Sequence, residues 1–356
     1  MQKILFLIIL VFIVMVIGVI FLPTPFSMPA SWTPDSAPEL SGLYAKNKKL
    51  LSSELLGTGE IYGPEDVAVD KAGIVYGGTQ DGKIIRIHPD KTVEDWITTG
   101  GRPLGLHFDS NGNLIVCDAY LGLLSISPNA EMTVLVDEVE GVPLGFTDDL
   151  DIAVDGKIFF TDASFKWNQA NYMMDLLEGR PYGRFIVYDP STNEAEVLLK
   201  DLYFPNGVAL SSSEEFVLIN ETWRYRILRY WLTGQNAGQK EIFIDNLPGF
   251  PDGVSGNDQG VFWLAMPTPR IPIIDAAQSR PWLSMFLGKL PKSIQPAPVE
   301  YGFILGLNES AEVIHNLQDP TGEILKEITS VEEYAGDLYI GSLHNDRIGR
   351  YPLPTL

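Results

Sequence analysis

Six copies of a strand–turn–strand unit run from residue 64 to residue 343, and this repeat constrains the fold more than any other feature of the chain. Each copy has a short apolar run, a turn with Asp, Gly, Asn or Ser, and a second apolar run, which is typical of paired β-strands. The copies begin PEDVAVDKAGIVYGGT, RPLGLHFDSNGNLIVCDA, TDDLDIAVDGKIFFTDA, PNGVALSSSEEFVLINET, PDGVSGNDQGVFWLAMP and TSVEEYAGDLYIGSL. Such repeats predict an all-β fold, a six-bladed β-propeller over residues 46–356. The last copy leaves little room for outer strands, so we expect residues 53–63 to supply one and close the ring.

Two of the intervals between copies are long. Aligned on one position, successive copies lie 39, 44, 58, 46 and 77 residues apart. The two longest intervals contain residues 168–179 and 280–292, where apolar residues recur at helical spacing. We therefore expect two short helical inserts. Each insert could cover a pocket as a lid, rest on a membrane or pack on the flank of the propeller, and the spacing does not choose among these roles.

The aligned position begins the innermost strand, which in a propeller lies at the mouth of the central channel. Its six occupants are Glu65, Leu104, Asp148, Asn206, Asp252 and Thr329. Three carboxylates brought to one axis repel each other unless a cation is present. Oxygen ligands suit Ca²⁺, and a position without His or Cys argues against zinc and copper. We interpret Glu65, Asp148, Asn206 and Asp252 as a Ca²⁺ site, the alternative being ordinary turn residues. Asp149 replaces Asp148 if the alignment slips by one residue.

The second strands of the copies end near the same rim. Asp162 and Glu221 stand there, and they either hold the metal ligands or act as corner residues that tie the blades together. Trp167, Trp223 and Trp263 either wall an apolar pocket or pack between blades. His107 lies three residues beyond Leu104 on a strand, so simple alternation turns it to the other face and predicts a packed histidine.

The N-terminal segment Ile4–Leu22 contains 19 consecutive uncharged residues. At ~1.5 Å per residue, a helix of this length nearly crosses a hydrocarbon core of ~30 Å. We expect an uncleaved transmembrane anchor in residues 1–22, with a cleaved signal peptide as the alternative, followed by a Pro-rich linker in residues 23–45. Lys3 is the nearest cationic side chain, so the positive-inside rule places the N-terminus in the cytoplasm and the propeller on the extracytoplasmic side. The net charge of −21 argues against a nucleic-acid partner.

Several phrases resemble a known family. IFFTDASFKW, GRFIVYDPSTNEAEVLLKDLYFPNGVALS, NLPGFPDGVSG and DLYIGSL are similar to the strictosidine synthase-like proteins, in particular the branch of adipocyte plasma membrane-associated protein. More distantly, the chain resembles gluconolactonase/regucalcin, diisopropylfluorophosphatase and paraoxonase, which are Ca²⁺-dependent six-bladed hydrolases. The resemblance implies that their channel-mouth ligands correspond to Glu65, Asp148, Asn206 and Asp252.

The chain also departs from these families at three of the aligned positions. Asp148 stands where the hydrolases usually have Asn, and Leu104 stands where paraoxonases have His. Thr329 occupies the position of the catalytic Glu in strictosidine synthase, and a hydroxyl group cannot deprotonate an amine as a carboxylate does. Alkaloid-forming condensation is therefore disfavoured.

The resemblance and the ligand set together predict a Ca²⁺-dependent hydrolase of lactones or aryl esters, similar to an arylesterase or lactonase, with a small-molecule substrate. The metal would polarise the carbonyl group, and Asp252 would act as the nucleophile or as the base for an attacking water. Leu104 and Thr329 are weak ligands that would leave one side of the ring open for substrate. The rival interpretation is a non-catalytic binding platform with a structural calcium ion, because a propeller fold alone does not establish activity.

Overall fold

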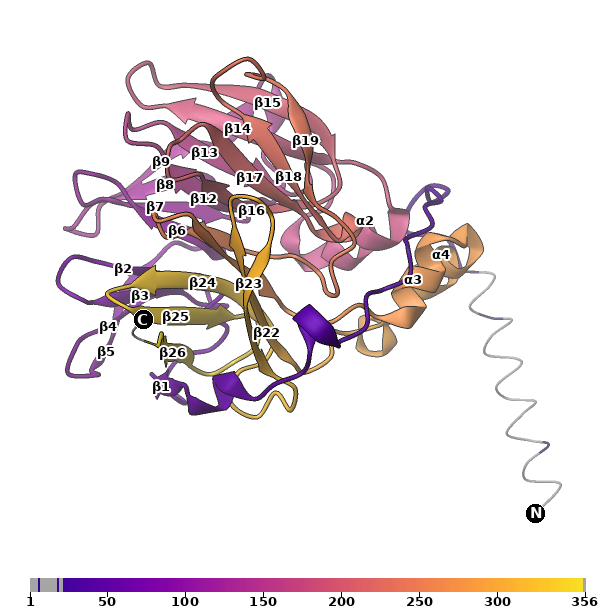
Figure 1. The fold of residues 1–356 in the computed structure, drawn as a ribbon. Coiled ribbons are helices and arrows are strands. Elements are labelled where there is room, and N and C mark those ends of the chain that lie inside the picture. Colours follow the sequence, from indigo (N-terminus) through magenta and orange to yellow (C-terminus); the bar gives the residue numbers. More distant parts are fainter. Residues whose placement is uncertain (1–5, 7–17, 19–21, 355–356) are drawn as a thin grey trace.

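The computed structural model describes residues 6, 18 and 22–354, and Figure 1 shows a body built mainly of β-strands. Six four-stranded antiparallel sheets make up this body. The innermost strands of consecutive sheets contact each other in order, and the last contacts the first, so the sheets form a closed ring. The predicted six-bladed β-propeller is confirmed.

The first three blades follow one another along the chain, each with its strands in sequence order from the centre outward. Blade 1 contains β2 (Val67–Val69), β3 (Val75–Gly78), β4 (Lys83–Ile87) and β5 (Val93–Thr98). Blade 2 contains β6 (Pro103–Phe108), β7 (Leu114–Asp118), β8 (Gly122–Ile126) and β9 (Met132–Val136). Blade 3 contains β12 (Thr147–Ile152), β13 (Ile158–Asp162), β14 (Gly183–Asp189) and β15 (Glu194–Leu202). A small hairpin, β10 (Glu138–Val139) and β11 (Val142–Pro143), precedes blade 3.

The next two blades repeat the pattern, and the sixth completes it with a strand from the other end of the chain. Blade 4 contains β16 (Pro205–Leu210), β17 (Phe216–Glu221), β18 (Arg226–Trp231) and β19 (Lys240–Ile244). Blade 5 contains β20 (Val254–Gly256), β21 (Val261–Met266), β22 (Gly302–Asn308) and β23 (Val313–Asp319). Blade 6 contains β24 (Ile328–Tyr334), β25 (Asp337–Ser342), β26 (Ile348–Pro352) and, outermost, β1 (Glu54–Leu56).

Strand β1 closes the ring as expected from residues 53–63. It pairs antiparallel with β26, with Glu54 opposite Arg350. One sheet thus joins both ends of the propeller, which leaves no unpaired blade to open the ring. The second strands β7, β13 and β17 are buried along their whole length, because neighbouring blades cover both of their faces. This explains why LIVC, IFF and FVLI read as unbroken apolar runs rather than alternating ones.

Both expected helical inserts are present, on one side of the propeller. Short 3₁₀ turns accompany them and the loops, at η1 (Gly42–Tyr44), η2 (Lys49–Ser52), η3 (Gln169–Asn171), η4 (Thr222–Arg224) and η5 (Lys292–Ile294). The first insert forms α2 (Tyr172–Glu178), which ends at Gly179 in the left-handed conformation that glycine tolerates best. The second forms α4 (Pro281–Gly288), preceded by a further helix, α3 (Pro272–Gln278), and both begin with proline at the first helical position.

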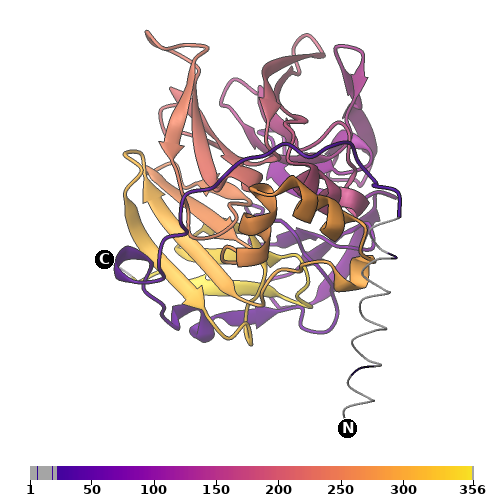
Figure 2. The same cartoon turned by 90° about the vertical axis from the view of Figure 1, so that its right-hand side faces the viewer.

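The segment expected as a linker is packed against the body. We call residues 23–48 the strap, and Figure 2 shows it in indigo crossing the face that carries α3 and α4. The backbone N–H of Ala30 donates to Glu178 O and that of Trp32 donates to Gln278 O, both at 2.9 Å. Phe26 is buried in a cluster with side chains of α2, α3 and α4. The strap therefore ties the three helices together.

The predicted membrane anchor in residues 1–22 lies almost wholly outside the described residues, so its prediction stands untested. Within the part of the chain that the structure describes, no helix is long and apolar enough to cross a membrane.

Candidate metal centre

The six aligned residues meet at one cavity at the channel mouth. Glu65, Leu104, Asp148, Asn206, Asp252 and Thr329 all line it, although they come from six different blades. Four of them lie where the register between the first two strands of a blade shifts, at Pro103/Leu106, Thr147/Leu150, Pro205/Val208 and Ile328/Ser330. Such irregularities re-aim side chains at strand ends. They turn these positions towards the mouth of the channel.

The phrases YFPNGVAL and GFPDGVSG repeat because adjacent blades touch at their glycines. The N–H of Gly207 donates to Asp252 O at 3.0 Å, and the N–H of Gly253 donates to Thr329 O at 2.8 Å. A Cβ on Gly207 would lie 2.5 Å from Asp252 O, and one on Gly253 would lie 2.5 Å from Thr329 O. Neither glycine has a positive φ, so the close approach of the next blade is what requires it. The packing of adjacent blades requires the repeated glycine, and the polar residue before it lines the cavity.

The cavity brings three carboxyl groups together where burial removes them from water. Burial raises the pKa of Glu65 well above its usual value, the charge of Asp252 raises it further, and Arg102 partly opposes the shift. Burial, followed by the charges of Glu65 and Asp252, raises the pKa of Asp148 in the same way. Burial raises the pKa of Asp252 to about 7, against a hydrogen bond from the Asn206 side chain. The three carboxyl groups therefore interact electrostatically, as the sequence predicts for side chains gathered at one axis.

The neighbours Asp148 and Asp149 have different roles. The two carboxylate oxygens of Asp149 accept hydrogen bonds from the backbone N–H groups of Leu150 at 2.8 Å and Val208 at 2.9 Å. Asp149 thus ties blade 3 to blade 4 and does not line the channel-mouth cavity. Asp148 is buried, and its Oδ2 atom has no hydrogen-bond partner among the described residues. The arrangement favours Asp148 over Asp149 as a ligand.

The donors fit a hard cation in their chemistry. A buried carboxylate oxygen without a partner costs free energy, and a bound cation would remove that cost. Carboxylates and an amide oxygen are the ligands that Ca²⁺ prefers. The described residues contain no group of three or more His, Cys, Asp or Glu side chains that could hold a metal ion, so Glu65, Asp148 and Asp252 do not form such a group in this structure. The fit therefore rests on the shared cavity, the unpaired Asp148 oxygen and the amide of Asn206.

Three aromatic side chains that were not predicted from the sequence line the walls of the cavity. Phe146, Phe204 and Phe250 line it, and each stands two residues before an aligned position in blades 3, 4 and 5. All three precede the innermost strand of their blade, and their recurrence at one place in the repeat was a signal that the sequence carried. Of the three tryptophans considered, Trp223 lines the cavity, whereas Trp263 is buried between blades. The cavity thus combines charged groups at its base with apolar walls.

Asp162 and Glu221 tie blade corners together. The Oδ1 atom of Asp162 accepts from the backbone N–H of Phe146 at 2.9 Å, and its Oδ2 atom accepts from Arg184 at 2.7 Å. Glu221 accepts from the backbone N–H of Tyr203 at 2.8 Å and from Arg226 at 2.6 Å. In blade 2, Asp118 accepts from the backbone N–H groups of Arg102 and Tyr120, both at 3.0 Å. These partners favour the corner interpretation over direct support of metal ligands.

His107 does not pack as expected. Its side chain is 41% exposed, lines a second, polar cavity further along the channel and lies 3.9 Å from Asp151 through its Nδ1 atom. The prediction was wrong because the register shift between Pro103 and Leu106 breaks the simple alternation along β6. His107 is nevertheless absent from the lining of the channel-mouth cavity.

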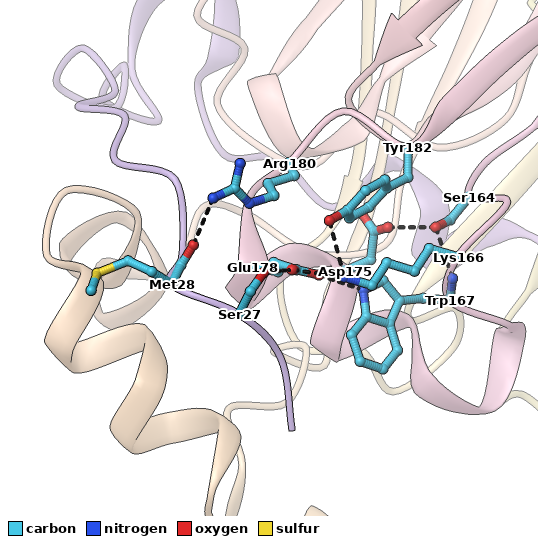
Figure 3. Close-up of polar contacts among 9 residues, drawn as sticks. All are labelled: Ser27, Met28, Ser164, Lys166, Trp167, Asp175, Glu178, Arg180 and Tyr182. Atoms are coloured by element: carbon cyan, nitrogen blue, oxygen red, sulfur yellow. Dashed lines mark hydrogen bonds and ion pairs between the residues drawn. The ribbon is translucent and has the colours of Figure 1, made fainter. Parts of the chain in front are cut away.

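Helix α2 carries a polar cluster that contacts the strap (Figure 3). Glu178 accepts hydrogen bonds from Lys166 at 2.7 Å, from the indole of Trp167 at 2.9 Å and from the hydroxyl of Ser27 at 2.8 Å. One turn earlier, Asp175 accepts from Ser164 at 2.6 Å and from the indole of Trp223 at 3.0 Å. Trp223 lines the cavity, so α2 fixes part of its wall.

Two family models match parts of the chain, and known proteins match most of its length. Residues 148–235 match the family model described as strictosidine synthase, and residues 42–87 match the one described as strictosidine synthase-like, N-terminal. The chain is 35% identical over 343 residues to adipocyte plasma membrane-associated protein of Homo sapiens, covering 90% of this chain and 82% of that protein. It is 36% identical over 312 residues to Protein STRICTOSIDINE SYNTHASE-LIKE 6 of Arabidopsis thaliana, covering 85% and 82%.

Solved structures resemble the chain in fold. A gluconolactonase from Xanthomonas campestris superposes with a TM-score of 0.62 at 17% identity, covering 94% of this chain and 99% of that one. The calcium-binding protein regucalcin from Agrobacterium tumefaciens superposes with a TM-score of 0.57 at 14% identity, covering 92% and 100%. At these identities the likeness shows the fold alone. The sequence relatives show more: the chain belongs to the strictosidine synthase-like family, with the adipocyte plasma membrane-associated proteins.

Proposed function

We propose that this protein is a membrane-anchored, Ca²⁺-dependent hydrolase of lactones or aryl esters. The observation that carries the proposal is one cavity that joins Glu65, Asp148, Asn206 and Asp252 at its base to aromatic walls. The resemblance in fold to a gluconolactonase and to a calcium-binding regucalcin supports this direction. The relatives named plasma membrane-associated support a membrane location, and the anchor in residues 1–22 would supply it with the propeller on the extracytoplasmic side.

The four oxygen donors would hold the ion, and the ion would polarise the carbonyl oxygen of the ester. Asp252 is the side chain we assign to proton transfer, because it is a carboxylate that lines the cavity beside the other proposed ligands and can accept a proton from water. In hydrolysis with Asp252 as base, the oxygen of water bonds to the carbonyl carbon and Asp252 takes one water proton. Asp252 then gives that proton to the leaving oxygen as the ester bond breaks. The alternative assignment makes the Asp252 carboxylate the nucleophile.

The apolar wall would orient the substrate and exclude water. Leu104, Phe146, Phe204 and Phe250 offer a surface for an aryl or acyl group beside the carboxylates. Leu104 supplies no ligand, so its side of the ring stays open to the substrate. The hydroxyl of Thr329 donates to the backbone carbonyl of Glu65 at 2.5 Å. It is committed to joining blade 6 to blade 1, which argues further against a condensation that needs a base at this position.

The test is turnover by the full chain stripped with chelator and reloaded with Ca²⁺. Phenyl acetate and a panel of small lactones would be assayed with the wild-type protein, Asp252→Asn and a control, Asp95→Asn, whose carboxylate is on the surface. We expect Ca²⁺-dependent hydrolysis that Asp95→Asn retains and Asp252→Asn loses. Full turnover in metal-loaded Asp252→Asn would remove Asp252 from the mechanism. Ca²⁺ binding without hydrolysis of any substrate in the panel would favour a binding platform.

A further inference from the structure

We propose that helices α3 and α4 rest on an anionic lipid surface and that the cavity takes its substrate from that surface. The substrate class would be an amphiphilic ester or lactone with a long hydrocarbon chain. The substrate part rests on the hydrolase function proposed above, whereas the lipid contact does not depend on it.

Exposed apolar side chains gather on and around these helices. Trp282 in α4 is 66% exposed, and Ile294, in the 3₁₀ turn that follows, is 62% exposed. Ile273, Val299, Met28 and Leu22 are exposed as well. Tryptophan prefers the boundary between lipid and water, where its ring is buried and its N–H stays hydrated. A group of exposed apolar side chains on this scale marks an interaction surface.

The same segments line the cavity from the inside. Ile273 in α3 is exposed, whereas Ile274 in the same helix and Ile271, which precedes it, line the cavity. After α4, the cavity-lining segment 296–298 lies between the exposed residues Ile294 and Val299. One layer of chain therefore separates the apolar exterior from the apolar interior. A hydrocarbon chain that leaves a lipid surface here would meet the cavity wall directly.

The charge of this region is opposite to that of the whole chain. Residues 270–299 have a net charge of +3. Arg270 is buried and pairs with Asp275 at 3.0 Å, so the surplus positive charge belongs to Arg280, Lys289 and Lys292. The chain as a whole has a net charge of −21. A lysine or arginine close to an anionic membrane surface is attracted to the lipid headgroups and strengthens binding. The positive sign singles out an anionic lipid surface as the partner of α3 and α4.

The N-terminal apolar segment joins the body at this surface. Pro25 and Phe26 contact Gly288 at the end of α4, because a Cβ on that glycine would lie 2.6 Å from the Phe26 ring. Ser27 and Met28 are held by Glu178 and Arg180 (Figure 3). Leu22 lies four positions before Phe26 in the sequence, and an extended chain spans at most ~3.6 Å per residue, so Leu22 lies within about 14 Å of Phe26. A membrane entered by Ile4–Leu22 would thus begin beside α4.

The lipid contact can be measured on the full chain in vesicles that contain phosphatidylserine. A cysteine would be placed at Trp282→Cys or Ile294→Cys and labelled with a fluorophore that reports polarity. The matched control is Val154→Cys, 92% exposed and lining the cavity at the other end of the channel. Native Cys117 is buried and would stay unlabelled. We expect nitroxide-labelled lipid to quench the labels at 282 and 294 about threefold more than the label at 154. Equal quenching at the three sites would overturn the proposal.

The substrate class has its own test. The variant Arg280→Glu with Trp282→Glu reverses the charge and removes the apolar anchor without touching a cavity-lining residue. We expect its hydrolysis of a long-chain lactone embedded in vesicles to fall about tenfold, while hydrolysis of a soluble short lactone is unchanged. Val154→Glu, as control, should alter neither rate. An unchanged rate on the embedded lactone, or an equal loss on both lactones, would overturn the substrate part. If the wild-type protein hydrolyses neither, the proposed function fails, and the quenching experiment still decides the lipid contact.

Discussion

The backbone N–H of Gly207 donates a hydrogen bond to the carbonyl oxygen of Asp252, with an N···O distance of 3.0 Å. This bond joins the two nearly identical phrases in blades 4 and 5. It leaves no room for a Cβ at Gly207, and it holds the backbone of a predicted metal ligand against the next blade. The side chains of Asn206 and Asp252 are consequently presented side by side to the cavity.

Gly207→Ala should disturb the metal centre through packing alone. The new Cβ would lie 2.5 Å from Asp252 O and 2.4 Å from Val254 N, both backbone atoms. Overpacking of this kind costs about 1–3 kcal/mol. We expect a lower free energy of unfolding in urea together with weaker Ca²⁺ binding. Gly112→Ala is the comparison, since it strains a turn with φ of 84° and has open space around the new atom. Unchanged Ca²⁺ affinity in Gly207→Ala would contradict the link between blade contact and ligand position.

The neighbours Asp148 and Asp149 should respond in opposite ways to loss of charge. Asp148→Asn removes a buried carboxylate whose oxygen lacks a partner, so the metal-free protein should become more stable and its stabilisation by Ca²⁺ should shrink. Asp149→Asn replaces one of two acceptors for backbone N–H groups by a donor, which costs about 1–3 kcal/mol. Thermal melts of both variants with and without Ca²⁺ check this. The reverse pattern would show that Asp149 is the ligand.

The stability of the metal-free protein should fall as pH rises. Burial raises the pKa of Asp252 to about 7, and the pKa values of Glu65 and Asp148 are raised in the same direction. A carboxyl group whose pKa is raised by folding stabilises the fold when protonated, so its contribution is full below about pH 4 and is lost as pH rises through about 7. We expect the melting temperature of the metal-free protein to drop between about pH 5 and pH 8. Ca²⁺ should restore it most strongly at the high end, because the ion competes with protons for the same oxygens. A metal-free melting temperature that rises over this range would contradict the electrostatics of the cavity.

Phe26→Ala should release the strap. Phe26 is buried with Met174 and Leu287, and truncating a buried phenylalanine costs about 3–5 kcal/mol where the surroundings cannot collapse. We expect faster hydrogen exchange at the amides of Ala30 and Trp32, which donate to the ends of α2 and α3. Met28→Ala, two residues further on and 68% exposed, is the matched control. Equal exchange rates in the two variants would mean that Phe26 does not hold the strap.

The repeat and its turn residues sufficed to predict six blades, the closing strand β1 and two helical inserts. These features follow from local signals, namely Asp–Gly turns, unbroken apolar runs and helical spacing, so a single sequence carries them. The gathering of six aligned residues at one cavity followed from the same alignment.

Details that depend on tertiary contacts could not be predicted. The division between Asp148 and Asp149 depends on where the N–H of Val208 lies, and Val208 belongs to another blade. His107 was misplaced because the irregular register near Leu106 is a property of the paired strands and not of β6 alone. Phe26 showed no signal in a Pro-rich stretch, since its partners in α2 and α4 are more than a hundred residues away in the sequence. These contacts between distant parts of the sequence exist only in the folded chain.

The most direct test of the central claim is a calorimetric titration of the metal-free full chain with Ca²⁺, repeated with Asp148→Asn, Asp252→Asn and the surface control Asp95→Asn. We predict that the wild-type protein and Asp95→Asn bind Ca²⁺ and that both channel-mouth variants lose this binding, because each removes a carboxylate donor from the same cavity. Wild-type Ca²⁺ affinity in Asp148→Asn and Asp252→Asn, or no binding by the wild-type protein, would contradict it.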